Sequence, residues 1–208
     1  MKSVLETSFL VTLWNVVLSI VQAQESPAHL TVYYEALCPD SRYFVTRPLH
    51  NALQTFPELN VKYVPFGKAS SNSYGGFDCQ HGPEECRGNI VHGCALARLE
   101  PGKAQHDFVY CGMLYPKQYE RCVVKSGLSW VDVEACSQSP EGSNYHRNFE
   151  VITKGETDGP TFVPSIAFNN VFDKSKSTEA FNDLESYLCA NHYSGHPKCA
   201  QQSFIFGK

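Results

Sequence analysis

The chain has nine cysteines among its 208 residues, and this number constrains its fold more than any other feature. Cysteines at this density are typical of proteins that fold in an oxidising compartment, where they pair as disulfides. An odd number leaves at least one thiol without an internal partner. Cys38 is the unpaired residue if the other eight form four bridges; these are Cys79, Cys86, Cys94, Cys111, Cys122, Cys136, Cys189 and Cys199. The sequence does not choose among the many pairings that eight cysteines allow.

The N-terminal segment has the pattern of a secretory signal peptide. Lys2 is followed by an apolar run over residues 9–20 and by small residues ending at Ala23, which predicts cleavage after residues 1–23. An uncleaved membrane anchor is the alternative, although the run contains Asn15 and is shorter than the roughly 20 residues of a membrane span. We expect residues 24–208 to form one domain without a membrane segment. A net charge of −4 gives no reason to expect nucleic acid or an anionic membrane as a partner.

The first part of this domain predicts a strand, a helix and a second strand. Residues 30–37 alternate β-branched and aromatic side chains and run directly into Cys38 and Pro39. Proline suits the first position of a helix, and an apolar stripe follows it, with a kink expected at Pro48. The stripe consists of Val45, Leu49, Leu53 and Phe56. A strand over residues 61–66 completes a βαβ unit, which implies parallel pairing with a right-handed crossover.

A cysteine-rich region of short helical patterns occupies residues 67 to about 160, and Ser129 is a candidate N-cap within it. The strand pattern resumes over residues 162–168, turns at Asn169-Asn170, and ends in one helix from about Ser177 through Leu188. The predicted fold is therefore α/β, with a helical insertion between a βαβ half and a ββα half. This order resembles the thioredoxin superfamily.

Residues 79–89 match the pattern C-Q-H-G-x-x-E-C-x-x-N at every specified position. These positions are Cys79, Gln80, His81, Gly82, Glu85, Cys86 and Asn89. The pattern resembles the signature of the gamma-interferon-inducible lysosomal thiol reductase family, and the resemblance extends over about residues 29–200. It implies a thioredoxin-like protein that exchanges thiols with disulfides, in which we expect the signature residues to be structural.

The resemblance also places a C-x-x-C pair on the turn after the first strand, where this chain has Cys38 and Ser41. The start of a helix favours a thiolate, so Cys38 is the candidate nucleophile and is expected to be free and exposed. A buried inert cysteine or an intermolecular bridge is the alternative. Ser41 is a candidate donor of a hydrogen bond to that thiolate, but a hydroxyl cannot resolve a mixed disulfide. The alternative is that Ser41 is an ordinary residue at the start of the helix, which satisfies backbone donors there.

The resemblance further implies that Val163 and Pro164 form the substrate platform, through a cis peptide bond that faces the nucleophile. An ordinary edge-strand proline is the alternative.

Two other arrangements compete for the signature residues. Cys79, His81, Cys86 and Cys94 could form a zinc site, although secreted cysteines are more often bridged. Gln80, His81, Glu85 and Asn89 could instead position substrate; we expect them to cap helices and to join the insertion together. The other histidines do not have the sequence spacing of a recognisable functional site, and we expect them at the surface or at helix caps. We expect no metal and no cofactor, with an external small-molecule thiol as a possible reductant.

The functional hypothesis is a secreted thiol-disulfide oxidoreductase that acts on protein disulfides through Cys38, in host defence as the family's immune association implies. Its partners would be disulfide-containing proteins, and its oligomeric state stays open. The alternative is a redox-inactive relative that binds proteins without turnover. No N-x-Ser/Thr sequon occurs, which favours an extracellular location over the lysosome.

Overall fold

The computed structural model describes residues 28–155 and 159–200. The predicted signal peptide lies outside these residues. Across the described ranges, no helix has the length and apolarity that a membrane span requires.

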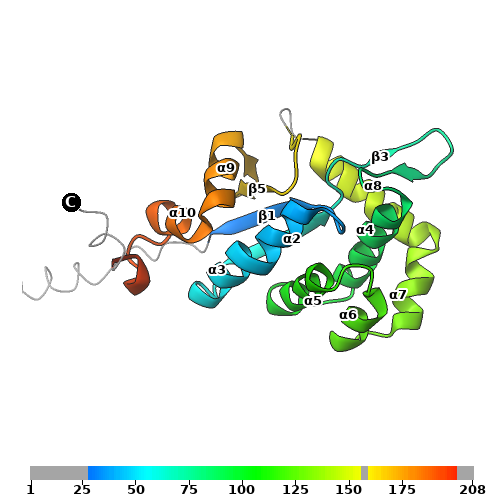
Figure 1. The fold of residues 1–208 in the computed structure, drawn as a ribbon, viewed down its shortest axis with the longest axis horizontal. Helices are drawn as coiled ribbons and strands as arrows, with labels where there is room; N and C mark the ends of the chain where they lie inside the picture. The colour runs from blue at the N-terminus through cyan, green and yellow to red at the C-terminus, as the bar shows by residue number, and fades with distance from the viewer. Residues whose placement is uncertain (1–27, 156–158, 201–208) are drawn as a thin grey trace, which may run out of the picture.

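A four-stranded sheet of order β2-β1-β5-β6 forms the centre of the molecule (Figure 1). Strand β1 (His29–Tyr34) pairs in parallel with β2 (Asn60–Pro65) and antiparallel with β5 (Ser165–Phe168), which turns back into β6 (Val171–Phe172). Alternate side chains of β1 enter different clusters: Val32 packs in the main core and Tyr33 in a second one with Phe66. The sheet is therefore buried on both faces, and the predicted strand-helix-strand unit is confirmed.

One helical stretch connects β1 to β2 and consists of α2 (Pro39–Phe44), the π-helical turn η1 (Val45–Leu49) and α3 (His50–Thr55). The π-helical turn contains Pro48, which cannot donate the hydrogen bond of a regular helix. At the position where a kink was expected, the helix accommodates Pro48 with one widened turn. The predicted apolar stripe faces the core, because Val45, Leu49 and Phe56 are fully buried.

The predicted insertion lies between β2 and β5 and is mostly helical, which confirms the fold class. It contains α4 (Pro83–Leu96), α5 (Lys103–Leu114), α6 (Tyr119–Lys125), α7 (Trp130–Ser137) and α8 (Pro140–Lys154). Ser129 caps α7 as predicted, by accepting a hydrogen bond from the backbone N–H of Asp132. The sequence patterns missed a small hairpin, β3 (Ser70–Ser71) and β4 (Phe77–Asp78), because each strand is only two residues long.

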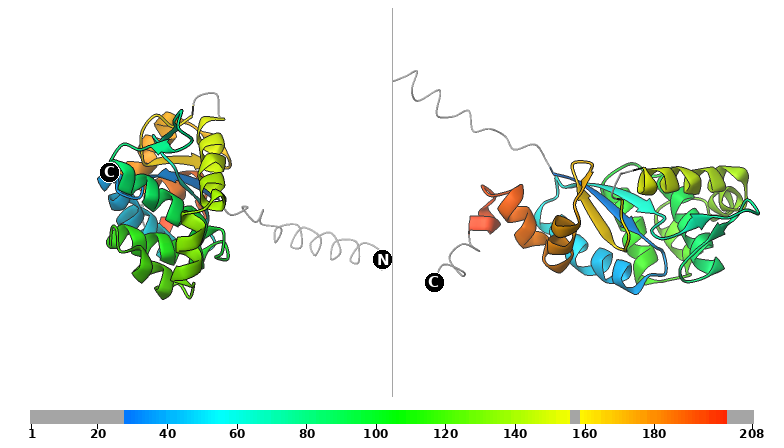
Figure 2. Two further views of the ribbon diagram at one scale, coloured as in Figure 1. Left: turned by 90° about the vertical axis from the view of Figure 1, so that its right-hand side faces the viewer. Right: turned by 90° about the horizontal axis from the view of Figure 1, so that it is seen from above.

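The C-terminal helix was predicted wrongly as one continuous element. It is two helices, α9 (Lys174–Asn182) and α10 (Leu184–Asn191), because the backbone of Asp183 is not helical (φ −152°, ψ 88°) and its side chain caps α10 through the N–H of Ser186. The turn before them was predicted correctly: Asn169 and Asn170 both have positive φ. Both views that show the length of the molecule place α9 and α10 at the end opposite the helical insertion (Figures 1 and 2).

All eight downstream cysteines form bridges, and Cys38 is the free thiol. The bridges join Cys79 to Cys86, Cys94 to Cys136, Cys111 to Cys122, and Cys189 to Cys199. This outcome confirms the expected framework and excludes the Cys₃His arrangement, since its three cysteines are consumed by disulfides.

The expectation that the remaining histidines lie at the surface was wrong for three of them. His92, His106 and His146 are buried, and burial lowers the pKa of each to about 4. His92 Nδ1 lies 2.9 Å from the Tyr34 hydroxyl and His106 Nδ1 lies 2.7 Å from that of Tyr63. These pairings join distant segments, so no local sequence spacing indicates them.

Candidate active site

Cys38 occupies the N-cap of α2, with φ −69° and ψ 124°. Pro39 begins the helix, and the Cys38 sulfur accepts the backbone N–H of Ser41 at 3.5 Å. A strand that enters the core directly before the turn fixes this position, because β1 is buried from Leu30 to Tyr34.

The sulfur is less accessible than the sequence suggested. Cys38 is only 5% exposed, and its Sγ lies 3.9 Å from the carbonyl oxygen of Val163, which accepts from the thiol. The expectation of an exposed thiol is therefore wrong: the segment that carries Val163 and Pro164 packs against it. The peptide bond between those two residues is cis, as predicted, and both residues are buried.

Ser41 lies within the turn, but its hydroxyl bonds to the backbone of Glu35 and not, as predicted, to the Cys38 sulfur. The hydroxyl oxygen accepts the backbone N–H of Glu35 at 3.4 Å, and the side chain is fully buried. The hydrogen bond to the sulfur comes instead from the Ser41 backbone. A backbone donor is available whatever side chain stands at this position, so the serine hydroxyl supports the turn.

The signature residues hold the insertion against this turn. Asn89, buried on α4, accepts the backbone N–H of Ala36 through Oδ1 at 2.8 Å. A Cβ on Gly88 would lie 2.9 Å from the Cβ of Ala36, so α4 approaches the turn too closely for a larger residue. Gly82 precedes α4 with φ +86°, a conformation that glycine tolerates best. These contacts fit the structural role that was expected for the signature residues. Gln80, by contrast, is exposed.

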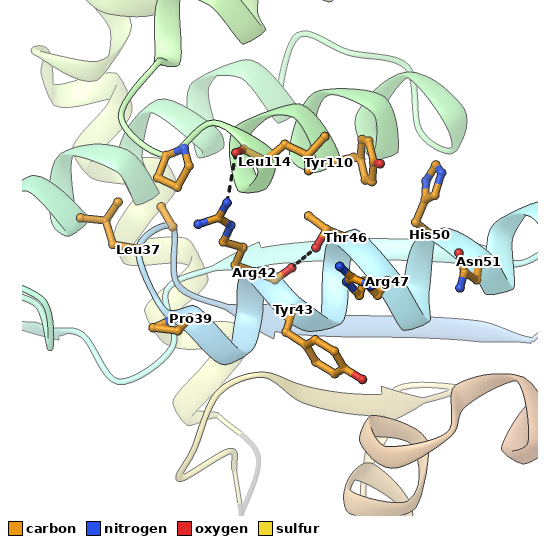
Figure 3. A pocket seen from close by; sticks show the side chains of 12 residues that line it. Leu37, Pro39, Arg42, Tyr43, Thr46, Arg47, His50, Asn51, Tyr110 and Leu114 are labelled. Atoms are coloured by element: carbon orange, nitrogen blue, oxygen red, sulfur yellow. Dashed lines mark hydrogen bonds between the residues drawn. The ribbon is translucent and has the colours of Figure 1, made fainter.

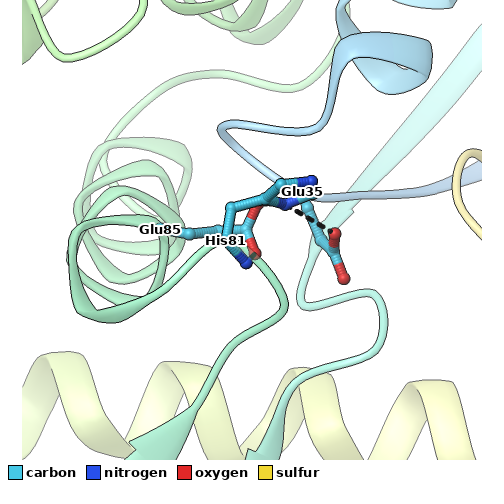
Figure 4. A group of neighbouring side chains, drawn as sticks. All are labelled: Glu35, His81 and Glu85. Atoms are coloured by element: carbon cyan, nitrogen blue, oxygen red, sulfur yellow. Dashed lines mark hydrogen bonds and ion pairs between the residues drawn. The ribbon is translucent and has the colours of Figure 1, made fainter.

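A cluster of three ionisable side chains lies next to the turn (Figure 4). His81 Nδ1 is 2.6 Å from Glu85 Oε2 and 3.6 Å from Glu35 Oε2. Both glutamates are fully buried, whereas the His81 side chain is 31% exposed. Burial raises the pKa of Glu35, and the charge of Glu85 acts in the same direction; the N–H of Lys68 and the charges of His81 and Lys68 oppose it. Sequence reasoning missed Glu35, whose only local signal is an acidic residue directly after a buried strand.

A basic groove of about 760 Å³ begins at the same turn and runs between the α2–α3 stretch and α5 (Figure 3). We call it the α2–α5 groove. Leu37 and Pro39, the neighbours of Cys38, line its start. Arg42 and Arg47 supply positive charge, and the lining contains no acidic residue. The other lining residues are Ala36, Tyr43, Thr46, His50, Asn51, Tyr110, Leu114 and Pro116.

Solved structures with a similar fold include known oxidoreductases. The oxidoreductase DsbA from Xylella fastidiosa matches with a TM-score of 0.52 at 10% identity, over 79% of this chain and 86% of that one. A thioredoxin-like oxidoreductase from Silicibacter pomeroyi DSS-3 gives a TM-score of 0.50 at 14% identity, over 76% and 86%. The chain thus has the thioredoxin-like fold with a helical insertion, and a cysteine caps the first helix of that fold.

The family described as Gamma interferon inducible lysosomal thiol reductase (GILT) matches residues 29–141, and the chain belongs to this family. GILT-like protein 1 of Drosophila melanogaster is 31% identical, over 83% of this chain and 78% of that protein. The gamma-interferon-inducible lysosomal thiol reductase of Carassius auratus is 28% identical, over 85% and 73%. Family and fold together define the class of thiol-disulfide oxidoreductases.

Proposed function

We propose that this protein exchanges disulfides in other proteins through a single nucleophilic cysteine, Cys38. The observation that carries the proposal is the free thiol at the start of α2, which accepts a backbone N–H and faces the cis Val163–Pro164 bond, while Ser41 occupies the position of a resolving cysteine. The bond from the thiol to the Val163 carbonyl has to open before the sulfur can attack.

The first step forms a mixed disulfide. The Cys38 thiolate attacks one sulfur of a substrate disulfide, that S–S bond breaks, and the second substrate sulfur leaves as a thiolate. Ser41 cannot displace the bound substrate, because its alkoxide is inaccessible near neutral pH. The intramolecular release step of a C-x-x-C site is therefore absent.

Release then requires another thiol. An external thiolate attacks the Cys38 sulfur and frees the reduced substrate, and a second external thiolate attacks the resulting adduct and restores Cys38. Two external thiols are oxidised to one disulfide as the substrate gains two electrons. If the thiolate of a different substrate cysteine attacks the bound sulfur instead, it forms a new disulfide with that sulfur and releases Cys38, so the disulfide is rearranged without net electron transfer.

The α2–α5 groove is the proposed binding surface for the substrate chain. It starts beside Cys38, and Arg42 and Arg47 give it a charge that complements acidic segments. We propose a secreted location and a role in host defence, with the lysosome as the alternative. The predicted signal peptide, the four bridges and the absence of a sequon support secretion.

A second candidate function is protein binding without turnover. The burial of Cys38 and the serine at position 41 favour it, because both features reduce catalytic exchange while leaving the groove intact.

Trapping of mixed disulfides tests the leading proposal. Wild-type protein incubated with a disulfide-bonded protein should form covalent adducts that reducing agent removes, and Cys38→Ala should form none. Ser41→Ala is the matched control and should still form adducts, because the sulfur receives its hydrogen bond from the backbone. Equal adduct formation by wild type and Cys38→Ala would reject Cys38 as the nucleophile.

A further inference from the structure

Glu35, His81 and Glu85 meet in one place although they come from two distant segments. Glu35 follows β1, whereas His81 and Glu85 both lie within the loop closed by the Cys79–Cys86 bridge, Glu85 in the first turn of α4. One polar atom of each lies within 4.8 Å of the other two (Figure 4).

Backbone hydrogen bonds orient both carboxylates. The N–H of Lys68 donates to Glu35 Oε1 at 2.7 Å, and the N–H of His81 donates to Glu85 Oε1 at 2.9 Å. Each glutamate therefore has one oxygen held in place and turns the other toward His81 Nδ1. Hydrogen bonds of this kind fix carboxylate ligands around metal ions in proteins.

Glu35 Oε2 provides an independent indication of a ligand. This atom is fully buried and has no hydrogen-bond partner among the described residues, since its 3.6 Å separation from His81 Nδ1 exceeds hydrogen-bond range. The carboxyl group cannot turn away easily, because Gly67 packs against its stem and a Cβ there would come within 2.6 Å of Oε1. A buried carboxylate oxygen without a partner requires a proton or a cation.

We propose that Glu35, His81 and Glu85 bind one divalent transition-metal ion, with Zn²⁺ as the best fit. One imidazole nitrogen and two carboxylate oxygens are a donor set that Zn²⁺ accepts. Tetrahedral ligands with bonds of about 2.0 Å lie roughly 3.3 Å apart, close to the separation of His81 from Glu35. The contact between His81 and Glu85 has to widen by less than about 1 Å, and the partly exposed His81 leaves room for the ion to enter and for a water ligand.

An ion at this site would also fix the active-site turn. The Glu35 carbonyl accepts the N–H of Cys38 at 3.3 Å, and the Glu35 N–H donates to Ser41 at 3.4 Å. Binding at the Glu35 carboxylate thus restrains the backbone on both sides of the nucleophile. The site itself does not depend on any exchange activity of Cys38.

Calorimetric titration of ZnCl₂ into full-length Cys38→Ala protein with intact disulfides tests the proposal without interference from the free thiol. We expect one Zn²⁺ per chain. Adding either Glu35→Gln or His81→Ala should weaken binding by at least about tenfold. Glu84→Gln is the matched control, because Glu84 lies in the same helical turn, is partly exposed and pairs with Arg87. It should bind Zn²⁺ like the parent.

Two results would overturn the proposal. The first is a lack of stoichiometric binding by the parent, which would indicate that the carboxylates share a proton. The second is unchanged affinity in His81→Ala, a variant in a partly exposed loop that should fold even if Glu35→Gln does not. Titration with Co²⁺ gives a second readout, since a visible absorption band should appear with the parent and be lost with His81→Ala.

Discussion

The proposed exchange mechanism depends most on the residue at position 41. The backbone N–H of Ser41 donates to the sulfur of Cys38, the proposed nucleophile, and its hydroxyl accepts the backbone N–H of Glu35. A cysteine differs from serine only by sulfur in place of the hydroxyl oxygen, so Ser41→Cys is the smallest change that adds a thiol. The backbone N–H of Ser41 lies 3.5 Å from the Cys38 sulfur, so an introduced thiol would be held one side chain away from it.

Ser41→Cys should therefore gain disulfide reductase turnover of roughly an order of magnitude or more, because a thiol held next to Cys38 replaces an external one. The measurement is reduction of a protein disulfide at mildly acidic to neutral pH, compared with wild type and with Ser41→Ala. A variant that forms a bridge between Cys38 and the introduced thiol yet gains no turnover would favour the binding function.

Labelling of thiols tests whether Cys38 is the free cysteine. Intact mass after alkylation of unfolded, non-reduced protein should show one modified cysteine, which peptide mapping assigns to Cys38, because the other eight are bridged. A label on Cys79 or Cys86 would contradict the bridge that encloses His81.

Helix α4 is the element that connects the signature to the active site. Its Asn89 side chain accepts the N–H of Ala36, a buried backbone group two residues before Cys38. Asn89→Ala leaves that group without a partner, and it should lower the free energy of unfolding by about 1–3 kcal/mol.

Urea denaturation monitored by circular dichroism measures this change. Asn191→Ala is the matched control, because Asn191 is an exposed residue that bonds to Tyr187 within α10. It should change stability by less than about 0.5 kcal/mol. Equal effects of the two substitutions would show that α4 is not anchored through Asn89.

Local patterns predicted the elements whose signals lie within a few residues. Ser129 marks the start of α7, and Asn169-Asn170 marks the β5–β6 turn. The break at Asp183 was missed because the apolar pattern of the helix continues through it. The Glu35 cluster and the burial of Cys38 could not be predicted, since both depend on segments far apart in the sequence.

Three buried histidines make the stability of the folded protein depend on pH, and their contributions add. The pKa of each is about 4 in the folded protein, against an ordinary value of 6.5. As pH falls below 6.5 the unfolded chain takes up protons that the folded protein does not. The contribution of these histidines to the free energy of unfolding is therefore present at neutral pH and is lost as pH falls from 6.5 toward 4.

His146 offers the cleanest test, because it packs against Phe66 and Phe77 on the second face of the sheet. Lowering the pH from 7 to 5 should cost wild type about 2 kcal/mol through this residue alone. His146→Leu should lose that part of the pH dependence in urea titrations at the two pH values. Identical pH dependence in both proteins would contradict a suppressed pKa at His146.

The pattern of bridges has a consequence for a protein exposed to proteases. Within the described residues, no disulfide crosses the tip of the β3–β4 hairpin, where Tyr74 is 95% exposed. A single chymotryptic cut after Tyr74 would leave Cys38 on one fragment and the signature and Val163–Pro164 on the other, with no covalent link between them. The nicked protein would keep its shape only through packing, and it would run as two bands on a denaturing gel without reductant.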